Sequence, residues 1–428
     1  MTKRIVSVLA LCALWSGAAS ADTAGGNWPA ITEAENATTA DLQRMASEFP
    51  HSGLMQLRLA QDAIDADRMA HAEAALWRYI AMGGTLTEAG QAVFMAAFSD
   101  ERWPLFVARM TYNAAPRTAS VPAASVPANL GLVEGIVHVS TINANLVSSV
   151  TARTVYEPSA EGWAPFSGVG GEPDPRSPQM GSPMGMAFDA ERGWLWVSSS
   201  AVDQTTEPDT AFVGMVGISP DRQEILWLPV GPGEQPGDVA LGPDGSAYLS
   251  DGATGAVYVR RVGAVALERL VEPGRLRSAQ GMVVSPDGSA LIVADYSYGL
   301  ARFDFETGAL DRITYDGPHM LDGIDGLVPH GNAIFAIRNG VRPHAILRLS
   351  ISDSGDRVTA VEIVERENPD WGEPTLGTIS GSSFRYIADA RWGDFGAGGA
   401  LNEGAEARTT AIRAIDLSPF ENQPDFRR

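Results

Sequence analysis

The chain has 428 residues, a formal net charge of −21 and a single cysteine. The length allows two or three domains, and the acidity argues against binding to the phosphate backbone of a nucleic acid. The cysteine, Cys12, lies in the apolar run near the amino terminus. Beyond that run, the chain therefore has no disulfides, thiolate metal sites or cysteine nucleophiles.

The amino terminus has the pattern of a secretory signal peptide. Lys3 and Arg4 precede an apolar run over residues 5–15, and Ala19-Ser20-Ala21 supplies small residues for cleavage. We predict a signal peptide over residues 1–21, whose removal lowers the formal charge from −21 to −23. The run is too short to span a bilayer, so no membrane span is expected. This leader on a chain without other cysteines predicts a bacterial protein that is periplasmic or secreted.

Residues 22–38 are rich in Gly, Ala, Thr and Asn and are expected to form a flexible lead-in. The apolar pattern then changes to a period of 3.6 over residues 39–115, which predicts a domain of short helices. Thr39, Ser52 and Thr87 are placed to begin three of them. Residues 116–129, with prolines, alanines and serines, are expected to be a linker.

Residues 49–84 resemble one and a half tetratricopeptide-type units, because short antiparallel helices with alanines at contact points stack into helix-pair solenoids. Two interpretations remain open for this helical domain. It could be a docking surface for a protein partner, or a small cap or dimerisation element packed on the main domain.

Residues 278–316 form the clearest repeat unit of the chain. Turn signals such as Pro286-Asp287-Gly288 divide the segment into four short strands, over residues 281–285, 290–296, 300–306 and 309–315. Four antiparallel strands of this kind are typical of one blade of a β-propeller. A single blade cannot bury both of its faces, so neighbouring blades are required.

Related strand pairs begin near residues 134, 184, 237, 280, 325 and 377, at intervals of blade size. They predict an all-β fold, a six-bladed propeller over residues 130–420, preceded by the small α-helical (helix-pair) domain. Closing strands are expected from residues 411–417 and from the segment before Glu134, which would protect the sheet edges.

The first residues of the inner strands of a propeller surround one mouth of its central channel. Here they include three carboxylates and one amide, Glu134, Asp238, Gln280 and Asp325. Oxygen ligands of this kind suit Ca²⁺, Mg²⁺ or Mn²⁺ rather than a soft metal. The sequence thus predicts a divalent-cation site, with Ca²⁺ as the first choice, formed by these four residues.

Four motifs resemble the senescence-marker-protein/gluconolactonase/luciferin-regenerating-enzyme-like family of six-bladed propellers. They are Glu134-Gly135, residues 279–288, Ala294-Asp295-Tyr296 and residues 321–327, and the resemblance covers about residues 131–417. It implies one divalent cation in the channel, held by a Glu, two Asn and an Asp. It also implies hydrolysis of lactones or phosphoester-like bonds, with the Asp near the metal as base.

By position, Glu134 matches the family Glu and Asp325 the family Asp. Gln280 stands at one Asn position and Gly237 at the other, where the neighbouring Asp238 or a water could supply the missing oxygen.

Several residues near this mouth are candidates for chemistry. Asp325 and Asp322 are candidate catalytic acids or bases, although either could instead cap the Gly-rich turn. Arg338 and Asn339 could orient an anionic group of a substrate, although Asn339-Gly340 could be simply a turn. Tyr296, at a strand end, is expected to contact a ligand.

Two functions follow from these features. The first is a metal-dependent hydrolase of a lactone or related small ester, in which the cation polarises the carbonyl and an Asp activates water. The alternative is a non-catalytic propeller that binds a small ligand or a protein, with the helical segment as a docking element.

Overall fold

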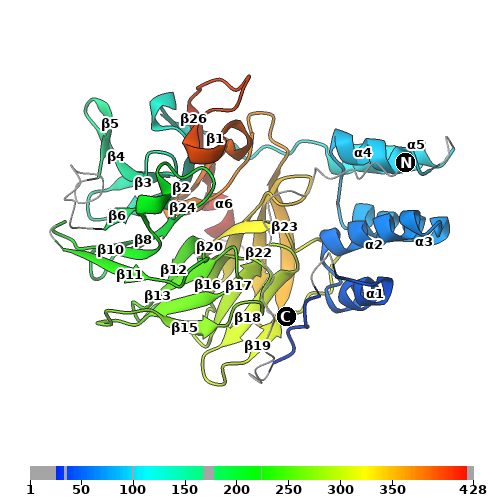
Figure 1. The fold of residues 1–428 in the computed structure, drawn as a ribbon, viewed down its shortest axis with the longest axis horizontal. Helices are drawn as coiled ribbons and strands as arrows, with labels where there is room; N and C mark the ends of the chain where they lie inside the picture. The colour runs from blue at the N-terminus through cyan, green and yellow to red at the C-terminus, as the bar shows by residue number, and fades with distance from the viewer. Residues whose placement is uncertain (1–25, 33–35, 99–100, 167–177, 223, 422–428) are drawn as a thin grey trace.

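The computed structural model describes residues 26–32, 36–98, 101–166, 178–222 and 224–421 (Figure 1). It is a ring of six four-stranded antiparallel sheets with five helices at one side. The predicted fold class is therefore confirmed. The predicted signal peptide lies outside the described residues. None of the described helices is both long and apolar enough to cross a membrane.

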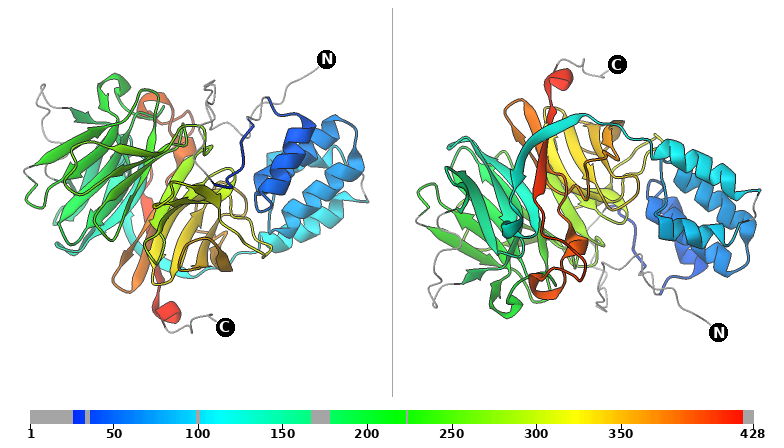
Figure 2. Two further views of the ribbon diagram at one scale, coloured as in Figure 1. Left: turned by 90° about the horizontal axis from the view of Figure 1, so that it is seen from below. Right: turned by 90° about the horizontal axis from the view of Figure 1, so that it is seen from above.

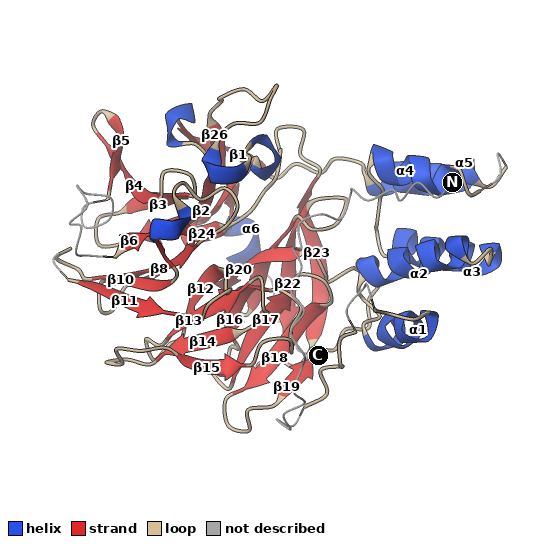
Figure 3. Cartoon of the chain, in the orientation of Figure 1, coloured by secondary structure: helices blue, strands red, loops and turns tan. Residues whose placement is uncertain are grey.

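Each blade runs from an inner strand at the channel to an outer strand at the rim (Figure 3). The first three blades are β2 (Val133–Val139), β3 (Ala144–Ser149), β4 (Thr154–Ser159), β5 (Gly162–Pro165); β7 (Ser182–Asp189), β8 (Trp194–Ser200), β10 (Gly214–Ile218), β11 (Ile225–Pro229); and β12 (Pro236–Leu241), β13 (Ala247–Asp251), β14 (Val257–Arg260), β15 (Glu268–Val271). The remaining three are β16 (Ala279–Val284), β17 (Ala290–Asp295), β18 (Gly299–Asp304), β19 (Leu310–Arg312); β20 (Ile324–His330), β21 (Ala333–Arg338), β22 (Ala345–Ile351), β23 (Val358–Arg366); and β24 (Gly377–Ser380), β25 (Ser383–Ile387), β26 (Thr410–Asp416), β1 (Ser120–Val126). A short parallel pair, β6 (Gln179–Met180) with β9 (Ala211–Phe212), joins loops of the first two blades.

The ring closes in the sixth blade, where β1 from the amino-terminal side pairs with β26 in antiparallel register, Ser120 opposite Ile415 and Val126 opposite Thr410. This pairing confirms the prediction that the segment before Glu134 supplies a closing strand. It also corrects the expected linker over residues 116–129, because β1 occupies most of it. The alanines and serines of this segment belong to an outer strand of the sixth blade and not to a flexible connection.

The inner strands share one irregularity close to their first residues. In five of them the pairing with the second strand shifts, between Val133 and Ile136 and at the corresponding positions of β7, β12, β16 and β20. Such bulges re-aim the side chains that they release from the ladder. The released residues are Glu134-Gly135, Met184-Gly185, Gly237-Asp238, Gln280-Gly281 and Asp325.

Serines on the second strands hold these bulges in place. The Ser148 hydroxyl accepts from the Gly135 amide at 2.8 Å and donates to the Met184 carbonyl oxygen of the next blade at 2.7 Å. Ser198 repeats the arrangement, donating to the Gly237 carbonyl oxygen at 2.8 Å. Both side chains are buried, so these serines stabilise contacts between blades and are not exposed nucleophiles.

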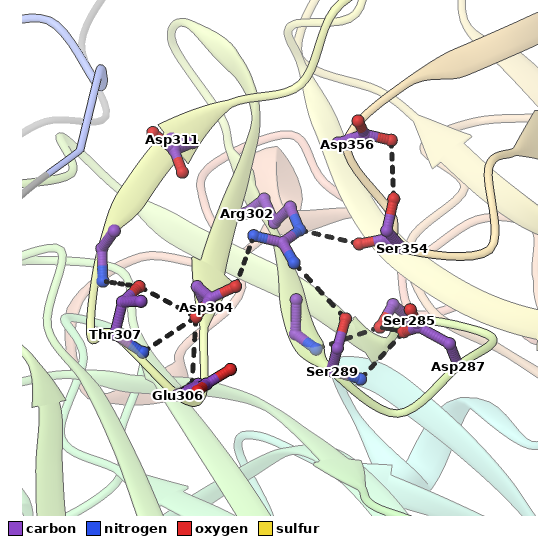
Figure 4. Close-up of polar contacts among 12 residues, drawn as sticks. Ser285, Asp287, Ser289, Arg302, Asp304, Glu306, Thr307, Asp311, Ser354 and Asp356 are labelled. Atoms are coloured by element: carbon purple, nitrogen blue, oxygen red, sulfur yellow. Dashed lines mark hydrogen bonds and ion pairs between the residues drawn. The ribbon is translucent and has the colours of Figure 1, made fainter.

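The fourth blade contains the predicted turns (Figure 4). At Pro286-Asp287-Gly288, Asp287 Oδ1 accepts from the Ser285 hydroxyl at 2.8 Å and from the Ser289 amide at 2.9 Å, while Gly288 adopts a φ of 75°. Arg302 forms an ion pair with Asp304 at 2.9 Å and donates to the Ser354 carbonyl oxygen at 2.7 Å. It thereby links this blade to a turn of the fifth.

The helical domain contains α1 (Thr39–Glu48), α2 (Gly53–Asp65), α3 (Met69–Ala81), α4 (Glu88–Met95) and α5 (Trp103–Asn113). The predicted cap of α2 is confirmed, because Ser52 accepts from the Met55 amide. The helix predicted to begin at Thr87 begins at Glu88, and Thr87 caps it by accepting from the Gly90 amide. The cap of α1 is Thr38 rather than Thr39, since Asp41 completes a capping box with Thr38. The resemblance to tetratricopeptide units stays a prediction.

The helices lie beside the fourth and fifth blades, as the views of Figure 2 agree. Phe49, after α1, stacks on Tyr298 with 4.7 Å between ring centroids, and Trp28 packs edge-on against Phe49. The Trp28 amide also donates to the Leu310 carbonyl oxygen of β19 at 2.9 Å. The expected flexible lead-in is thus corrected for its described part, because a buried tryptophan attaches it to the propeller.

Candidate functional site at the channel mouth

Three of the four predicted metal ligands are carboxylates released by bulges of different inner strands. Glu134 comes from β2, Asp238 from β12 and Asp325 from β20. A fourth carboxylate, Glu373, precedes β24 and was not predicted. Because the inner strands are neighbours around one ring, residues almost 200 positions apart lie at the same mouth.

The charges of these carboxylates act on one another. Burial raises the pKa of Glu134 well above its usual range, and the Asp325, Glu373 and Asp238 carboxylates raise it further. Burial also raises the pKa of Asp238 to about 7, and the charge of Asp325 acts in the same direction. Glu134 is buried and Asp238 and Asp325 are partly buried, so their mutual repulsion makes full ionisation of the three carboxylates costly without a nearby positive charge.

Asp325 is held by the predicted substrate-binding residues. Asn339 Nδ2 donates to Asp325 Oδ2 at 2.7 Å and lies 2.9 Å from the Pro374 carbonyl oxygen. The Tyr296 hydroxyl donates to Asn339 Oδ1 at 2.9 Å. The structure therefore brings together three residues that the sequence singled out separately, in a chain from Tyr296 through Asn339 to Asp325.

Glu134 has a partner that sequence reasoning missed. Trp392 Nε1 donates to Glu134 Oε2 at 2.6 Å from the loop between β25 and β26. A signal was present in the sequence, since Ala388-Asp389 directly follows the second strand of the sixth blade and Ala294-Asp295 ends that of the fourth. An aromatic residue follows within three positions in both blades, Tyr296 in the fourth and Trp392 in the sixth. Only Tyr296 was predicted from the sequence to be a site residue.

The two positions that depart from the family pattern face each other. A Cβ atom on Gly237 would lie 3.3 Å from Gln280 Oε1, and Gln280 Nε2 donates to the Ser278 hydroxyl at 3.0 Å. The amide oxygen of Gln280 thus borders the space that a side chain at residue 237 would occupy. Asp238 stands at the position that is glycine in β2, β7 and β16, and its carboxylate lies against Gly185.

Two predicted site residues have other surroundings. The carboxylate of Asp322 is buried at the start of α2 and accepts from the Leu54 amide at 2.9 Å, within 3.1 Å of the Ser52 hydroxyl. Arg338 is only 3% exposed and donates to the carbonyl oxygens of Met320 and Pro343. We therefore do not assign a catalytic role to Asp322 or substrate binding to Arg338. Asp322 belongs to the buried contact with the helical domain, and the guanidinium of Arg338 is buried against backbone carbonyl oxygens of the propeller.

The donor set fits a hard cation by its chemistry, because every candidate ligand atom is oxygen. Trp392 and Asn339 each occupy one carboxylate oxygen, of Glu134 and of Asp325. Within the part of the chain that the structure describes, no three His, Cys, Asp or Glu side chains form a ready metal-holding group. A cation here would need the Gln280 oxygen or water to complete its shell, which Ca²⁺ tolerates.

The channel continues from this mouth as a cavity of about 310 Å³. Residues on or beside all six inner strands line it, and Asp238 connects it to the carboxylates. Most of the lining side chains are aliphatic, including Val137, Met186, Met282 and Leu327. A small molecule bound at the carboxylates would therefore meet an apolar wall below them.

No family model and no curated protein matches this chain. Similar solved structures include a gluconolactonase from Xanthomonas campestris, with 15% identity, a TM-score of 0.43, and coverage of 70% of this chain and 98% of that one. Another is the calcium-binding protein regucalcin from Agrobacterium tumefaciens, with 15% identity, a TM-score of 0.44 and coverage of 69% and 95%. A virginiamycin B lyase from Staphylococcus aureus matches with 13% identity, a TM-score of 0.43 and coverage of 66% and 80%. The chain is a six-bladed β-propeller, and its structural neighbours include gluconolactonase-like propellers.

Proposed function

We propose that the channel mouth binds a divalent cation, Ca²⁺ in the first place, and that the protein hydrolyses a lactone or a related small ester. The observation that supports this proposal is that bulges of three different blades release Glu134, Asp238 and Asp325 near the start of their inner strands, where the charges of these carboxylates act on one another. Gln280 adds a neutral oxygen beside them. Carboxylate and amide oxygens are the donors that Ca²⁺ prefers.

When bound, a divalent cation would polarise the carbonyl of the ester and neutralise the carboxylates around it. In this proposal Asp325 accepts the proton of the attacking water, as the general base. Asn339 keeps one oxygen of Asp325 occupied, so the proton goes to the other oxygen, and Tyr296 fixes the orientation of Asn339. Trp392 holds Glu134 in the same way.

The test is hydrolysis of a panel of five- and six-membered lactones by the purified protein, before and after chelation and after Ca²⁺ is restored. We expect chelator-sensitive turnover that Asp325→Asn lowers by about 100-fold or more, the scale of a lost general base. Asp316→Asn is the matched control, because Asp316 is an exposed carboxylate paired only with Arg357 among the described contacts. Turnover that Asp325→Asn leaves unchanged would refute the assignment of the base.

A second candidate function is a non-catalytic propeller that binds a small ligand or, through its helices, a protein partner. The observation in its favour is that the described carboxylates do not form a ready three-ligand metal group. The same lactone panel separates the two functions. Binding of a lactone without turnover, at any Ca²⁺ concentration, would favour the second.

We also propose that the protein acts in the periplasm or outside the cell, as the basic and apolar leader over residues 1–21 suggests. Cell fractionation of the full chain tests this. A protein recovered in the cytoplasm with its leader intact would contradict it.

A further inference from the structure

The start of α2 lies on the propeller close to the candidate site. The Ser52 hydroxyl is 2.9 Å from the Ser297 carbonyl oxygen and 3.1 Å from Asp322 Oδ2. Asp322 Oδ2 also accepts from the Leu54 amide at 2.9 Å. A propeller carboxylate thus occupies the positive end of a helix from the other domain, where a negative charge is stabilised. Ser52 and Asp322 are fully buried, so water does not weaken this contact.

The propeller residues in this contact lie close in sequence to residues of the candidate site. Ser297 follows Tyr296, and Asp322 is separated from Asp325 by Gly323 and Ile324. Arg338, also buried at this boundary, precedes Asn339. The helical domain therefore holds residues close in sequence to Tyr296 and Asp325, whereas Arg338 donates to Met320 and Pro343 of the propeller itself.

The backbone of Gly323 connects Asp322 to Tyr296 and Asn339 by hydrogen bonds. Its amide donates to the Tyr296 carbonyl oxygen at 2.7 Å, and its carbonyl oxygen accepts from the amides of Asn339 and Gly340, both at 3.0 Å. Its φ of 68° is one that glycine adopts at little cost, and a Cβ there would lie 2.8 Å from the Val341 amide nitrogen. Gly323 thus fixes the backbone of Asn339, which binds Asp325, and of Tyr296, which binds Asn339.

We propose that the helical domain is a positioning element of the channel mouth, acting from the start of α2 through Asp322 and Gly323 on Tyr296, Asn339 and Asp325. This inference rests on the proposed function, because it takes those three residues to be the part of the site that binds the cation and activates water. It gives Asp322 and Ser52 positioning roles, since neither needs to touch substrate. Such outer partners commonly determine whether a ligand set is held in a productive geometry.

The test compares Ser52→Ala and Asp322→Asn with Thr87→Ala, by calorimetric titration with Ca²⁺. Thr87 is a matched control, because it caps α4 through the Gly90 amide and is exposed. We expect the first two variants to weaken Ca²⁺ binding by about tenfold or more, and Thr87→Ala to leave it unchanged. Equal affinities in folded Ser52→Ala, Asp322→Asn and wild-type protein would overturn the proposal.

Amide hydrogen exchange gives a second readout that needs no cation. The amides of Asn339 and Gly340 should exchange about tenfold faster in Ser52→Ala, because the carbonyl oxygen that they share is less firmly placed. The Gly135 amide, which Ser148 holds in the first blade, should not change. If wild-type protein binds no Ca²⁺, the proposed function fails while this comparison still decides the positioning role. Unchanged exchange at Asn339 and Gly340 would overturn it.

Discussion

Trp392 Nε1 lies 2.6 Å from Glu134 Oε2, so the indole of the sixth blade donates to the carboxylate of the first. The two residues are 258 positions apart and meet only because the ring closes. Glu134 is buried, and the charges of Asp325, Glu373 and Asp238 act on its carboxylate. The contact therefore determines which oxygen of Glu134 stays available to a ligand.

Trp392→Phe should weaken Ca²⁺ binding by about tenfold, because the ring is kept while the donor to Glu134 is lost. Trp371→Phe is the matched control, since it removes an indole donor that binds the Tyr386 hydroxyl at 2.8 Å. That control should lower the free energy of unfolding by about 1 kcal/mol without changing affinity. Calorimetric titration with thermal melting separates the two effects. Equal affinities in both variants would contradict the role of Trp392.

Gly237→Asn should strengthen Ca²⁺ binding by about tenfold, because it adds an amide oxygen where the family resemblance expects one. The φ of Gly237 is not in the left-handed region, and the added Cβ would lie 3.3 Å from Gln280 Oε1, so a small shift accommodates it. Gly237→Leu has a similar size without the oxygen and should not strengthen binding. If Asn and Leu have the same effect, the resemblance fails at this position.

Glu365→Ala should lower the free energy of unfolding by about 3 kcal/mol or more, because it orphans several buried donors where the ring closes. Glu365 accepts from the Ser120 hydroxyl at 2.8 Å and from the Tyr386 hydroxyl at 2.9 Å, connecting β23 to both β1 and β25. Glu362→Ala, a half-buried position of β23, is the control and should change stability by about 0.5 kcal/mol at most. Urea unfolding measures both. Similar losses would contradict the closing role of Glu365.

His344 should make the protein less stable in mild acid. Burial lowers the pKa of His344 to about 3, and the nearby Arg342 and Arg338 charges act in the same direction. The folded state therefore keeps His344 neutral while the unfolded chain binds a proton below pH 6.5. Above that pH the titration of His344 does not lower the free energy of unfolding. Below it, the free energy of unfolding falls by about 1.4 kcal/mol per pH unit as the pH decreases toward 3.

His344→Gln cannot take up this proton, so its unfolding free energy should decline less than that of wild-type protein between about pH 6 and pH 4. Other titrating groups contribute to both curves, so the difference between the curves reports His344. Urea unfolding at several pH values measures it. Parallel curves would show that His344 is protonated in the folded state as readily as in the unfolded chain.

Local patterns predicted much of this architecture. Blade spacing and turns such as Pro286-Asp287-Gly288 predicted the six sheets, and Ser52 and Thr87 predicted two helix starts, because these signals depend on residues close in sequence. The carboxylates at the mouth could be listed from the starts of the inner strands. That these carboxylates lie at the same mouth followed only from the closed ring of six blades.

Contacts between domains could not be predicted in this way. Asp322 and Arg338 looked like site residues because they lie close in sequence to Asp325 and Asn339, but the start of α2 binds the carboxylate of Asp322 and backbone carbonyl oxygens of the propeller bind Arg338. The hydrophobic periodicity of the sequence does not predict which carboxylate will bind the start of α2. Trp28 was likewise predicted to lie in a flexible segment, because its partners Phe49 and Leu310 are distant in sequence.

The central claim, a cation at the channel mouth, is tested most directly by the melting temperature of the metal-free protein with and without Ca²⁺. A ligand that binds only the folded state raises the melting temperature, and at about 100 times its Kd it adds about 2.7 kcal/mol. We predict a clear rise for wild-type protein and none for Glu134→Gln, with bound metal found by elemental analysis of the wild type alone. The same melting temperature with and without Ca²⁺, Mg²⁺ or Mn²⁺, and no metal in the purified protein, would contradict the account.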